Sequence, residues 1–396
     1  MAIDLVAIAP DQRTRIRDAW CELERATPPS YFLSWGWVET WLDALPPSPG
    51  ITLYVARRAG APIAAFFLGA HTQWRHRVLP SRTLYLNQTG LSAYDEICIE
   101  YNGLIHAGAP PVADILARLP GGWDEIFLAA LDAEGALATQ LAGDGAGTAD
   151  HARLRVRVDR RVLSPMVDLD KVRASGDYVK LLGSNTRSQI RRTRKLYGAR
   201  GALVAEIASS PAQALAFFEE LVALHRRTWA ERGQAGAFLP FVLAFHQRLI
   251  ERRFAAGEIQ MIRVRTGDTT VGCLYNMVWQ GSVLFYQSGL VYESDSKLKP
   301  GLVCHALAVD HDARAGHRYY DFLGGESRYK QSLATDVRSL VWLRIQQPRV
   351  RFAIEDAARA LRDIVRARRA ARAAAEPRPP GSGAGDGGDG GEHAVT

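Results

Sequence analysis

Apolar segments of strand length alternate with glycine turns and one segment of helical length near the C-terminal end of the chain. Residues 282–292 predict a strand, the turn Lys299-Pro300-Gly301 follows, and residues 302–315 predict a helix that ends at Gly316. A short aromatic strand then begins at His317 and runs into Gly324-Gly325. The order strand, glycine turn, helix, strand predicts a parallel βαβ unit.

The pattern upstream of this unit predicts further strands and helices of ordinary length. A helix is expected from Tyr178, and the turns at 266–268 and 280–281 separate antiparallel strands. The other expected elements are a strand at 202–207, helices at 211–230 and 239–256, and strands at 258–265 and 270–279.

The N-terminal part shows a similar succession of helices, strands and a crossover. Its expected elements are an opening helix, a short helix ending near Leu45, strands at 51–57, 62–70, 82–86 and 96–100, a helix at 111–119, a strand at 123–128 and an extended stretch at 153–167. Both parts begin with helices and continue with a hairpin and an α/β crossover, as an ancient duplication would produce. The predicted fold class is therefore mixed α/β, with two halves that each contain a mixed sheet flanked by helices.

These patterns divide the chain into four regions. Residues 1–165 form the N-terminal half and residues 166–350 the C-terminal half, which carries the βαβ unit. Residues 351–375 predict a basic helix whose charges can simply face solvent. Residues 376–396 are rich in glycine and proline and nearly lack apolar side chains, so we expect them to be disordered.

Charge and cysteine usage narrow the classes of partner. The net charge of +7 suits a phosphate-rich cofactor, a nucleic acid or an anionic lipid surface. No apolar run approaches the roughly 20 residues that span a bilayer, and the first residues do not resemble a signal peptide, so we expect a cytoplasmic protein without a membrane span. The four cysteines are scattered without metal-ligand spacing, which indicates neither disulfides nor a metal site.

A basic helix is predicted between residues 183 and 201. Ser184 is a candidate N-cap, and Arg187, Arg191 and Arg194 share one face of the helix. Three guanidinium groups on one face can bind phosphates. A solvated basic face is the alternative.

His225 and Trp229 lie four residues apart on one face of the helix predicted at 211–230. A histidine in this position could act as a base or line a substrate pocket. A purely structural role is the alternative, since a lone helical histidine is often structural.

The turn before the helix predicted at 302–315 offers a phosphate site. Gly301 precedes that helix, whose first N–H groups and positive dipole end can bind a pyrophosphate. Lys297 and Lys299 add positive charge at the same turn.

Four polar side chains follow or interrupt the strand at the end of the βαβ unit. Asp321 lies between aromatic residues, where a charge is costly unless it is paired or functional. Glu326, Tyr329 and Lys330 follow the glycines in an expected loop. Lys330 could stabilise an oxyanion and Tyr329 could donate a proton to a leaving group. A structural ion pair between Asp321 and Lys330 is the alternative.

These residues resemble those of GNAT-type acyltransferases related to the cellulose-biosynthesis protein CelD, which also resemble the FemAB aminoacyl transferases. The resemblance is good over residues 169–343 and weak before them. It rests on the segments at 185–192 (NTRSQIRR), 224–238, 245–246, 285–289 (FYQSG), 300–301 and 320–330 (YDFLGGESRYK), with a weaker match at 30–41.

The resemblance implies a tandem GNAT-like fold that transfers an acyl group from acetyl-CoA or another acyl-CoA to an amine or hydroxyl group. In this fold two parallel strands splay apart and expose backbone groups to the pantetheine amides. The implied catalytic residues are Lys330, Tyr329, Asp321, Glu326 and His225. The implied donor-binding residues are Gln287, Ser288, Lys297, Lys299, Gly301, Leu302, Arg187 and Arg191.

Two alternatives remain open, because the usual GNAT cofactor signature is replaced here by K-P-G-L-V at 299–303. The donor could be an aminoacyl-tRNA, as in FemAB relatives, or the protein could be a non-catalytic member of an exopolysaccharide system. Outside the tRNA alternative we expect a small-molecule or saccharide acceptor and no nucleic acid. Tyr94, Asp95, Tyr101 and Asn102 are candidates for acceptor contacts.

Overall fold

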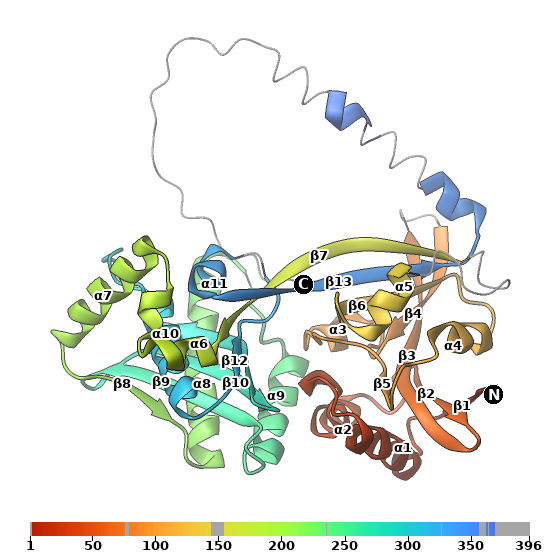
Figure 1. Ribbon diagram of the computed structural model, residues 1–396, viewed down its shortest axis with the longest axis horizontal. Coiled ribbons are helices and arrows are strands. Elements are labelled where there is room, and N and C mark those ends of the chain that lie inside the picture. The colour runs from red at the N-terminus through yellow and green to blue at the C-terminus, as the bar shows by residue number, and fades with distance from the viewer. Residues whose placement is uncertain are drawn as a thin grey trace.

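The structure is a computed structural model that describes residues 2–75, 79–143, 154–234, 236–325, 327–355, 362 and 364–368. Its strands form one 13-stranded mixed sheet in the order β1-β2-β3-β4-β6-β13-β7-β12-β11-β10-β9-β8, with β5 paired to β3. Helices cover both faces of this sheet (Figure 1).

The elements of the first half extend from β1 to β7. They are β1 (Asp4–Ile8), α1 (Arg13–Ala26), the 3-10 helix η1 (Tyr31–Leu33), α2 (Trp35–Ala44), β2 (Ile51–Arg58), β3 (Ala61–Arg75), β4 (Leu79–Leu86), α3 (Ser92–Asp95), β5 (Ile105–His106), α4 (Val112–Arg118), β6 (Glu125–Asp132), α5 (Ala136–Gly143) and β7 (Arg155–Asp168).

The elements of the second half extend from α6 to β13. They are α6 (Leu169–Ser175), the 3-10 helix η2 (Tyr178–Leu181), α7 (Ser184–Gly198), β8 (Leu203–Ile207), α8 (Pro211–Glu231), α9 (Pro240–Arg253), β9 (Ile259–Thr266), β10 (Thr269–Trp279), β11 (Ser282–Leu290), α10 (Pro300–Arg314), β12 (Tyr319–Asp321), α11 (Arg328–Leu333) and β13 (Asp336–Gln346).

The two halves repeat the same strand pattern, which confirms the predicted fold class. In the first half β1 to β4 form an antiparallel series, and β6 then pairs parallel to β4. In the second half β8 to β11 form the antiparallel series, and β12 pairs parallel to β11. A helix precedes the second strand of each parallel pair, α4 before β6 and α10 before β12.

The halves exchange their last strands. β7 ends the first half but pairs with β12 of the second, and β13 ends the second half but pairs with β6 of the first. β7 and β13 also pair with each other along most of their length, and Figure 1 shows these two long strands bridging the halves. The predicted boundary at residue 165 therefore falls inside β7.

One hydrophobic core is shared by both halves. On one face of the sheet it joins residues of α1 and α2 to residues of α8 and α9, and the Trp37 and Phe245 rings meet there with centroids 4.8 Å apart. Two further clusters cover the other face, under α6, α7 and α10 in the second half and under α4 and α5 in the first. Burying this much apolar surface across the junction favours a fixed arrangement of the halves.

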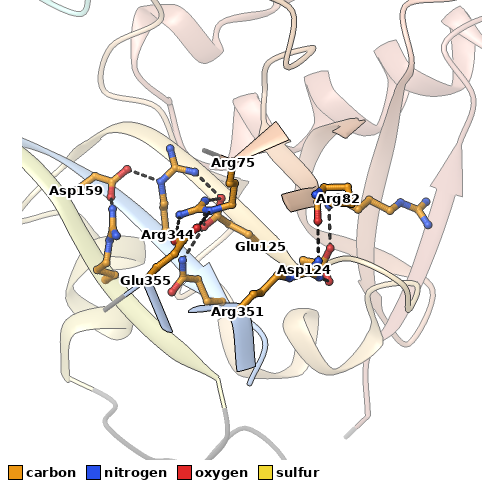
Figure 2. Close-up of polar contacts among 11 residues, drawn as sticks. Arg75, Arg82, Asp124, Glu125, Asp159, Arg344, Arg351 and Glu355 are labelled. Atoms are coloured by element: carbon orange, nitrogen blue, oxygen red, sulfur yellow. Dashed lines mark hydrogen bonds and ion pairs between the residues drawn. The ribbon is translucent and has the colours of Figure 1, made fainter. Parts of the chain in front are cut away.

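A cluster of ion pairs fastens the end of β13 and the residues after it to the first half (Figure 2). Glu125 is fully buried on β6, where it accepts hydrogen bonds from Arg75 (2.9 Å), Arg344 and Gln346 (2.7 Å). Arg75 also pairs with Glu355 at 2.6 Å. Because a buried carboxylate that loses its partners is left with a costly unpaired charge, this cluster fixes β13 against β6.

The structure corrects several details of the predicted elements. Residues 96–100 are not a strand, since Cys98 and Tyr101 have φ angles of 46° and 47°. Ser184 does not cap α7, because Gly183 occupies the N-cap position and Ser184 is the first helical residue. The chain opens with strand β1, and the strand β13 was not predicted.

Some expectations concern the termini or the whole chain. Residues 350–355 and 364–368 are helical, while 376–396 lie outside the described residues. Among the described residues, no helix has both the length and the apolar character needed to cross a membrane. Within those same residues, no cluster of His, Cys, Asp or Glu side chains is placed to bind a metal ion.

Candidate active site

A pocket of about 180 Å³ lies where β11 and β12 separate. The two strands pair only from Ser282 to Leu284 on β11 and from Tyr319 to Asp321 on β12. A bulge at Tyr286 then bends β11, because the register with β10 passes from Asn276↔Phe285 to Tyr275↔Gln287. After β12 the chain turns at Leu323, which has a φ of 58°. The splayed parallel strands expected from the sequence are therefore present.

Besides Ala237 and Phe238 just before α9 and Val242 at its start, four parts of the chain line this pocket. β11 contributes Phe285 to Ser288 and Leu290, and α8 contributes His225 and Trp229. The segment after β12 contributes residues 323–325 together with Tyr329 and Lys330. The fourth part comes from the first half and includes Glu96, Cys98 and Glu100.

Glu100 reaches into the second half and accepts a hydrogen bond of 2.7 Å from the backbone N–H of Gly324. Burial raises the pKa of the Glu100 carboxyl to about 7, against the opposing effects of this hydrogen bond and of the charge on Lys330. The side chain is partly open to the pocket although protein surrounds it. A carboxyl group with a pKa near neutrality and access to a pocket can exchange a proton with a ligand.

Lys330 contacts the backbone carbonyl oxygen of the same glycine. Its Nζ donates to the carbonyl oxygen of Gly324 at 3.2 Å and lies 5.8 Å from the ring centroid of Phe285. Gly325 has a φ of 154°, and a Cβ there would lie 3.2 Å from this Nζ. The glycines therefore allow the lysine to approach the backbone closely.

Tyr329 precedes Lys330 on the short helix α11, so the predicted loop at these residues is wrong. Its ring stacks on His305 of α10, with the centroids 5.8 Å apart and the planes at 24°. His305 is fully buried, and its Nδ1 lies 3.0 Å from the hydroxyl of Tyr320. The aromatic stack fixes the Tyr329 ring at the wall of the pocket.

His225 lines the pocket, but both of its ring nitrogens are engaged in holding the backbone. Nδ1 lies 3.3 Å from the carbonyl oxygen of Ser288, and Nε2 accepts a hydrogen bond of 3.1 Å from the N–H of Ala237. The ring is 4% exposed, and burial lowers its pKa to about 4. This arrangement does not leave a lone pair for the predicted role of base, and it favours the alternative of a structural histidine.

Asp321 does not point into this pocket, which corrects its predicted grouping with Lys330. It is 3% exposed and accepts hydrogen bonds from the Tyr101 hydroxyl (2.5 Å), the Ser164 hydroxyl (3.0 Å) and the Leu323 N–H (2.7 Å). Burial raises the pKa of its carboxyl. Asp321 and Tyr101 instead line a second cavity, of about 360 Å³, between the halves.

The predicted donor-binding residues lie in three places. Gln287 and Ser288 line the pocket on β11. Gly301 and Leu302 form the first turn of α10, before its first internal hydrogen bond from Val303 N to Lys299 O (3.3 Å). The start of α10 therefore retains N–H groups that suit a phosphate. Lys297 and Lys299 precede α10 and do not line the pocket.

The basic face of α7 points away from the rest of the fold. The helix buries Thr186, Ile190, Thr193 and Tyr197, and an open hollow lies on its outer side. The described residues that line the hollow all belong to α7, namely Ser184, Arg187, Ser188, Arg191, Arg192 and Lys195. Arg194 does not join this group, because it pairs with Asp310 of α10 at 2.9 Å.

Glu326 lies outside the described residues. The residue that the sequence analysis missed is Glu100, which it placed in an ordinary strand. The available signal was an acid in the otherwise apolar segment Ile97-Cys98-Ile99-Glu100-Tyr101. Such an acid is costly to bury unless it is paired or functional.

Comparison with known proteins supports the GNAT-like fold. Residues 184–331 match the family model of the acetyltransferase (GNAT) domain. The crystal structure of FemX is similar, with a TM-score of 0.55, 10% identity, and coverage of 89% of this chain and 99% of that chain. The C-terminal domain of a protein assigned as a lysylphosphatidylglycerol synthetase from Agrobacterium fabrum gives a TM-score of 0.50 at 10% identity, over 89% of this chain and 96% of that chain. At this identity the two structures share the fold alone, and no curated protein sequence matches.

Proposed function

We propose that the protein is an acyltransferase that moves an acyl group from an acyl-CoA to an amine or hydroxyl group in the pocket between β11 and β12. The observation that carries this proposal is the convergence of Glu100 and Lys330 on Gly324, where β12 has left β11. The match of residues 184–331 to the acetyltransferase domain supports the reaction class. A saccharide or other precursor of polysaccharide or cell-envelope biosynthesis is the proposed acceptor, from the resemblance to CelD-type proteins.

The donor would lie along the free edge of β11. Gln287 and Ser288 border the pocket there, and the first turn of α10 offers the N–H groups of Gly301 and Leu302 to the phosphates. Lys297 and Lys299 add charge near that turn. Arg187 and Arg191 lie on the outer face of α7, so we assign them no contact with the pantetheine arm or the thioester.

Glu100 is the proposed general base. As the acceptor nitrogen or oxygen attacks the thioester carbonyl carbon, its proton passes to the Glu100 carboxylate. Lys330 is the proposed stabiliser of the negative oxygen of the tetrahedral intermediate, through its ammonium group. The carbon–sulfur bond then breaks, and Tyr329 is the proposed donor of a proton to the leaving thiolate. His225 is assigned the positioning of β11 and the loop at Ala237.

A calorimetric titration with acetyl-CoA, longer acyl-CoAs and free coenzyme A tests the donor. Micromolar binding should weaken in a Lys297→Ala/Lys299→Ala double variant. The matched control is Arg118→Ala, which removes an exposed cation from α4. No binding by any thioester would overturn the proposed donor, and binding without transfer to any amine or saccharide would favour the non-catalytic alternative.

The outer face of α7 favours one further candidate, an aminoacyl-tRNA-dependent transferase. Among the described residues that line its hollow, four are cations and none is a carboxylate, as suits an RNA backbone. This alternative expects tRNA binding that weakens steeply with salt and is lost in Arg187→Ala/Arg191→Ala. Absence of tRNA binding at low salt would remove it.

A further inference from the structure

Asp321 holds two residues that are immediate neighbours of the Glu100–Gly324 contact. Its Oδ2 accepts the hydrogen bond from the Tyr101 hydroxyl, and Tyr101 directly follows Glu100. Its Oδ1 accepts the hydrogen bond from the N–H of Leu323, and Leu323 directly precedes Gly324. One carboxylate therefore fixes both sides of the contact between the base and the glycine.

Both of these neighbours have an unusual backbone conformation. Tyr101 has a φ of 47° and Leu323 a φ of 58°, a region that residues other than glycine rarely occupy. Such conformations persist where surrounding contacts hold them. The hydrogen bond from the Leu323 N–H to Asp321 stabilises the turn at Leu323. The hydrogen bond from the Tyr101 hydroxyl to Asp321 stabilises the turn at Tyr101.

A third element completes the network. The Ser164 hydroxyl of β7 donates to Asp321 Oδ1 at 3.0 Å, and its oxygen lies 3.0 Å from the Tyr101 hydroxyl oxygen. The backbone of Tyr101 is held as well, since its carbonyl oxygen accepts a hydrogen bond of 2.9 Å from the Ser30 hydroxyl. The network therefore joins the segment that carries Glu100 to β7 and to the end of β12.

We infer that Asp321, with Tyr101 and Ser164, is a positioning device that holds the base Glu100 of the first half against the Gly324 turn of the second half. This inference rests on the proposed function, and it assigns Asp321 a role that acts through Glu100. No bond to a substrate is required of Asp321, which is buried and has its hydrogen bonds satisfied within the protein.

The charge of Asp321 also affects a measurable quantity, the pKa of Glu100. A role of Asp321 in protein stability alone would not change that pKa. Among the described residues, the charged and titratable groups around Glu100 are Lys330 of α11, Arg160 of β7, Asp321 of β12, Tyr286 of β11, and Glu96, Cys98 and Tyr101 of its own segment. Among them the Asp321 carboxylate raises the pKa of Glu100, while Lys330 and Arg160 lower it. Asp321→Asn keeps the shape of the side chain and removes the charge, so Glu100 should lose its proton at a lower pH.

The experiment is a titration of Glu100 by carbon NMR on the full chain labelled at glutamate carboxyl carbons, with Glu100→Gln used to assign the signal. Asp321→Asn should move the midpoint to lower pH. Tyr101→Phe and Ser164→Ala keep the charge but weaken the network, and transfer from acetyl-CoA should fall roughly 10-fold in kcat with little change in KM. Thr266→Val is the control, because it removes a buried hydroxyl that donates to Tyr197 O in another part of the second half.

The outcomes separate this inference from the proposed function. If Glu100→Gln keeps full transfer activity, the base is wrong and the inference fails with it. If Glu100→Gln is inactive while Asp321→Asn leaves the Glu100 midpoint unchanged and Tyr101→Phe leaves kcat unchanged, only the inference is overturned. Should Asp321→Asn fail to fold, the rates of Tyr101→Phe and Ser164→Ala decide.

Discussion

The two halves have the same strand pattern and both separate their parallel strands, but the wedge between these strands stays open to a pocket of about 180 Å³ in the second half. In the first half β4 and β6 pair from Thr83 to Tyr85, and Asn102 then inserts beyond the paired region. Its N–H donates to Ala130 O of β6 at 3.1 Å, and its Nδ2 donates to Leu86 O of β4 at 3.0 Å. In the first half, the chain itself therefore fills the wedge between the separating strands β4 and β6. The equivalent wedge of the second half, between β11 and β12, stays open.

Side chains complete the filling of the first wedge. Asn87 accepts from the Phe67 N–H at 2.8 Å and donates to Asn102 Oδ1 at 2.8 Å and to Gly103 O at 2.7 Å. Asn102 and Gly103 also line the cavity of about 360 Å³ between the halves, which Asp321 borders. The space left beside Phe67 and Asn87, under Trp37 and Trp41, is only about 10 Å³. The corresponding pocket of the second half is about 180 Å³.

The same topology can therefore serve packing in one half and, under the proposed function, chemistry in the other. The helix after β6, α5, starts with Ala136 and Leu137, whereas α11 after β12 carries Tyr329 and Lys330. The segment that fills the first wedge also delivers Glu100 to the second. The first half thus fills its own wedge between β4 and β6, and it supplies Glu100 to the pocket between β11 and β12 of the second half.

Of the substitutions considered, Glu100→Gln should cause the largest loss of transfer activity. Loss of the base should lower turnover by about 10² to 10⁴. Initial rates of transfer from acetyl-CoA measure the effect, with Glu96→Gln as the control because it lines the same pocket without contacting Gly324. Full activity of Glu100→Gln would mean that the first half contributes no base to the reaction.

Lys330→Ala should lower kcat by about 10² or more, as expected for the loss of one group that stabilises an oxyanion. Arg328→Ala is the matched control, since it removes an exposed cation from the same helix α11. If both variants lose activity equally, the effect belongs to the helix and not to the ammonium of Lys330.

The pH dependence should separate Glu100 from His225. Because burial raises the pKa of Glu100 to about 7, kcat/KM should rise with pH through a midpoint near 7 as the base becomes ionised. His225, with a pKa lowered to about 4, stays neutral across this range. A profile that is flat between pH 6 and 8 would contradict the assignment of Glu100.

The same pKa shift predicts an effect on stability. A carboxyl whose pKa is raised on folding contributes stability that is present below its unfolded pKa and lost as pH rises through 7. Glu100→Gln removes the cost of the buried charge, so its melting temperature relative to the parent protein should increase from pH 5 to pH 8. Thermal unfolding at both pH values checks the sign.

A substitution that removes a side chain filling the wedge of the first half should lower the stability of the protein more than its transfer activity. Asn87→Ala leaves the Phe67 N–H and the Gly103 carbonyl without their buried partner, and it should lower the free energy of unfolding by about 1–3 kcal/mol. Ser92→Ala, at an exposed position on α3, is the control. A large loss of kcat in folded Asn87→Ala would mean that the first wedge also takes part in transfer.

The sequence predicted most of the elements and the βαβ unit around the pocket, because periodicity and glycine turns are local signals. It failed where partners are distant in the chain. Asp321 was recognised as a costly charge, but its partner Tyr101 is 220 positions earlier. Glu100 was assigned to a strand because the apolar residues of 96–100 favour one, whereas tertiary contacts hold them in turns.

Amide hydrogen exchange of the full chain with and without acetyl-CoA is the most direct test of the difference between the halves. Acetyl-CoA should protect amides at 286–290 and 323–325, where β11 and β12 separate, and should leave exchange unchanged at 86–89 and 128–131, where the first wedge is filled. Protection in the first half without protection in the second would show that the donor does not bind between β11 and β12.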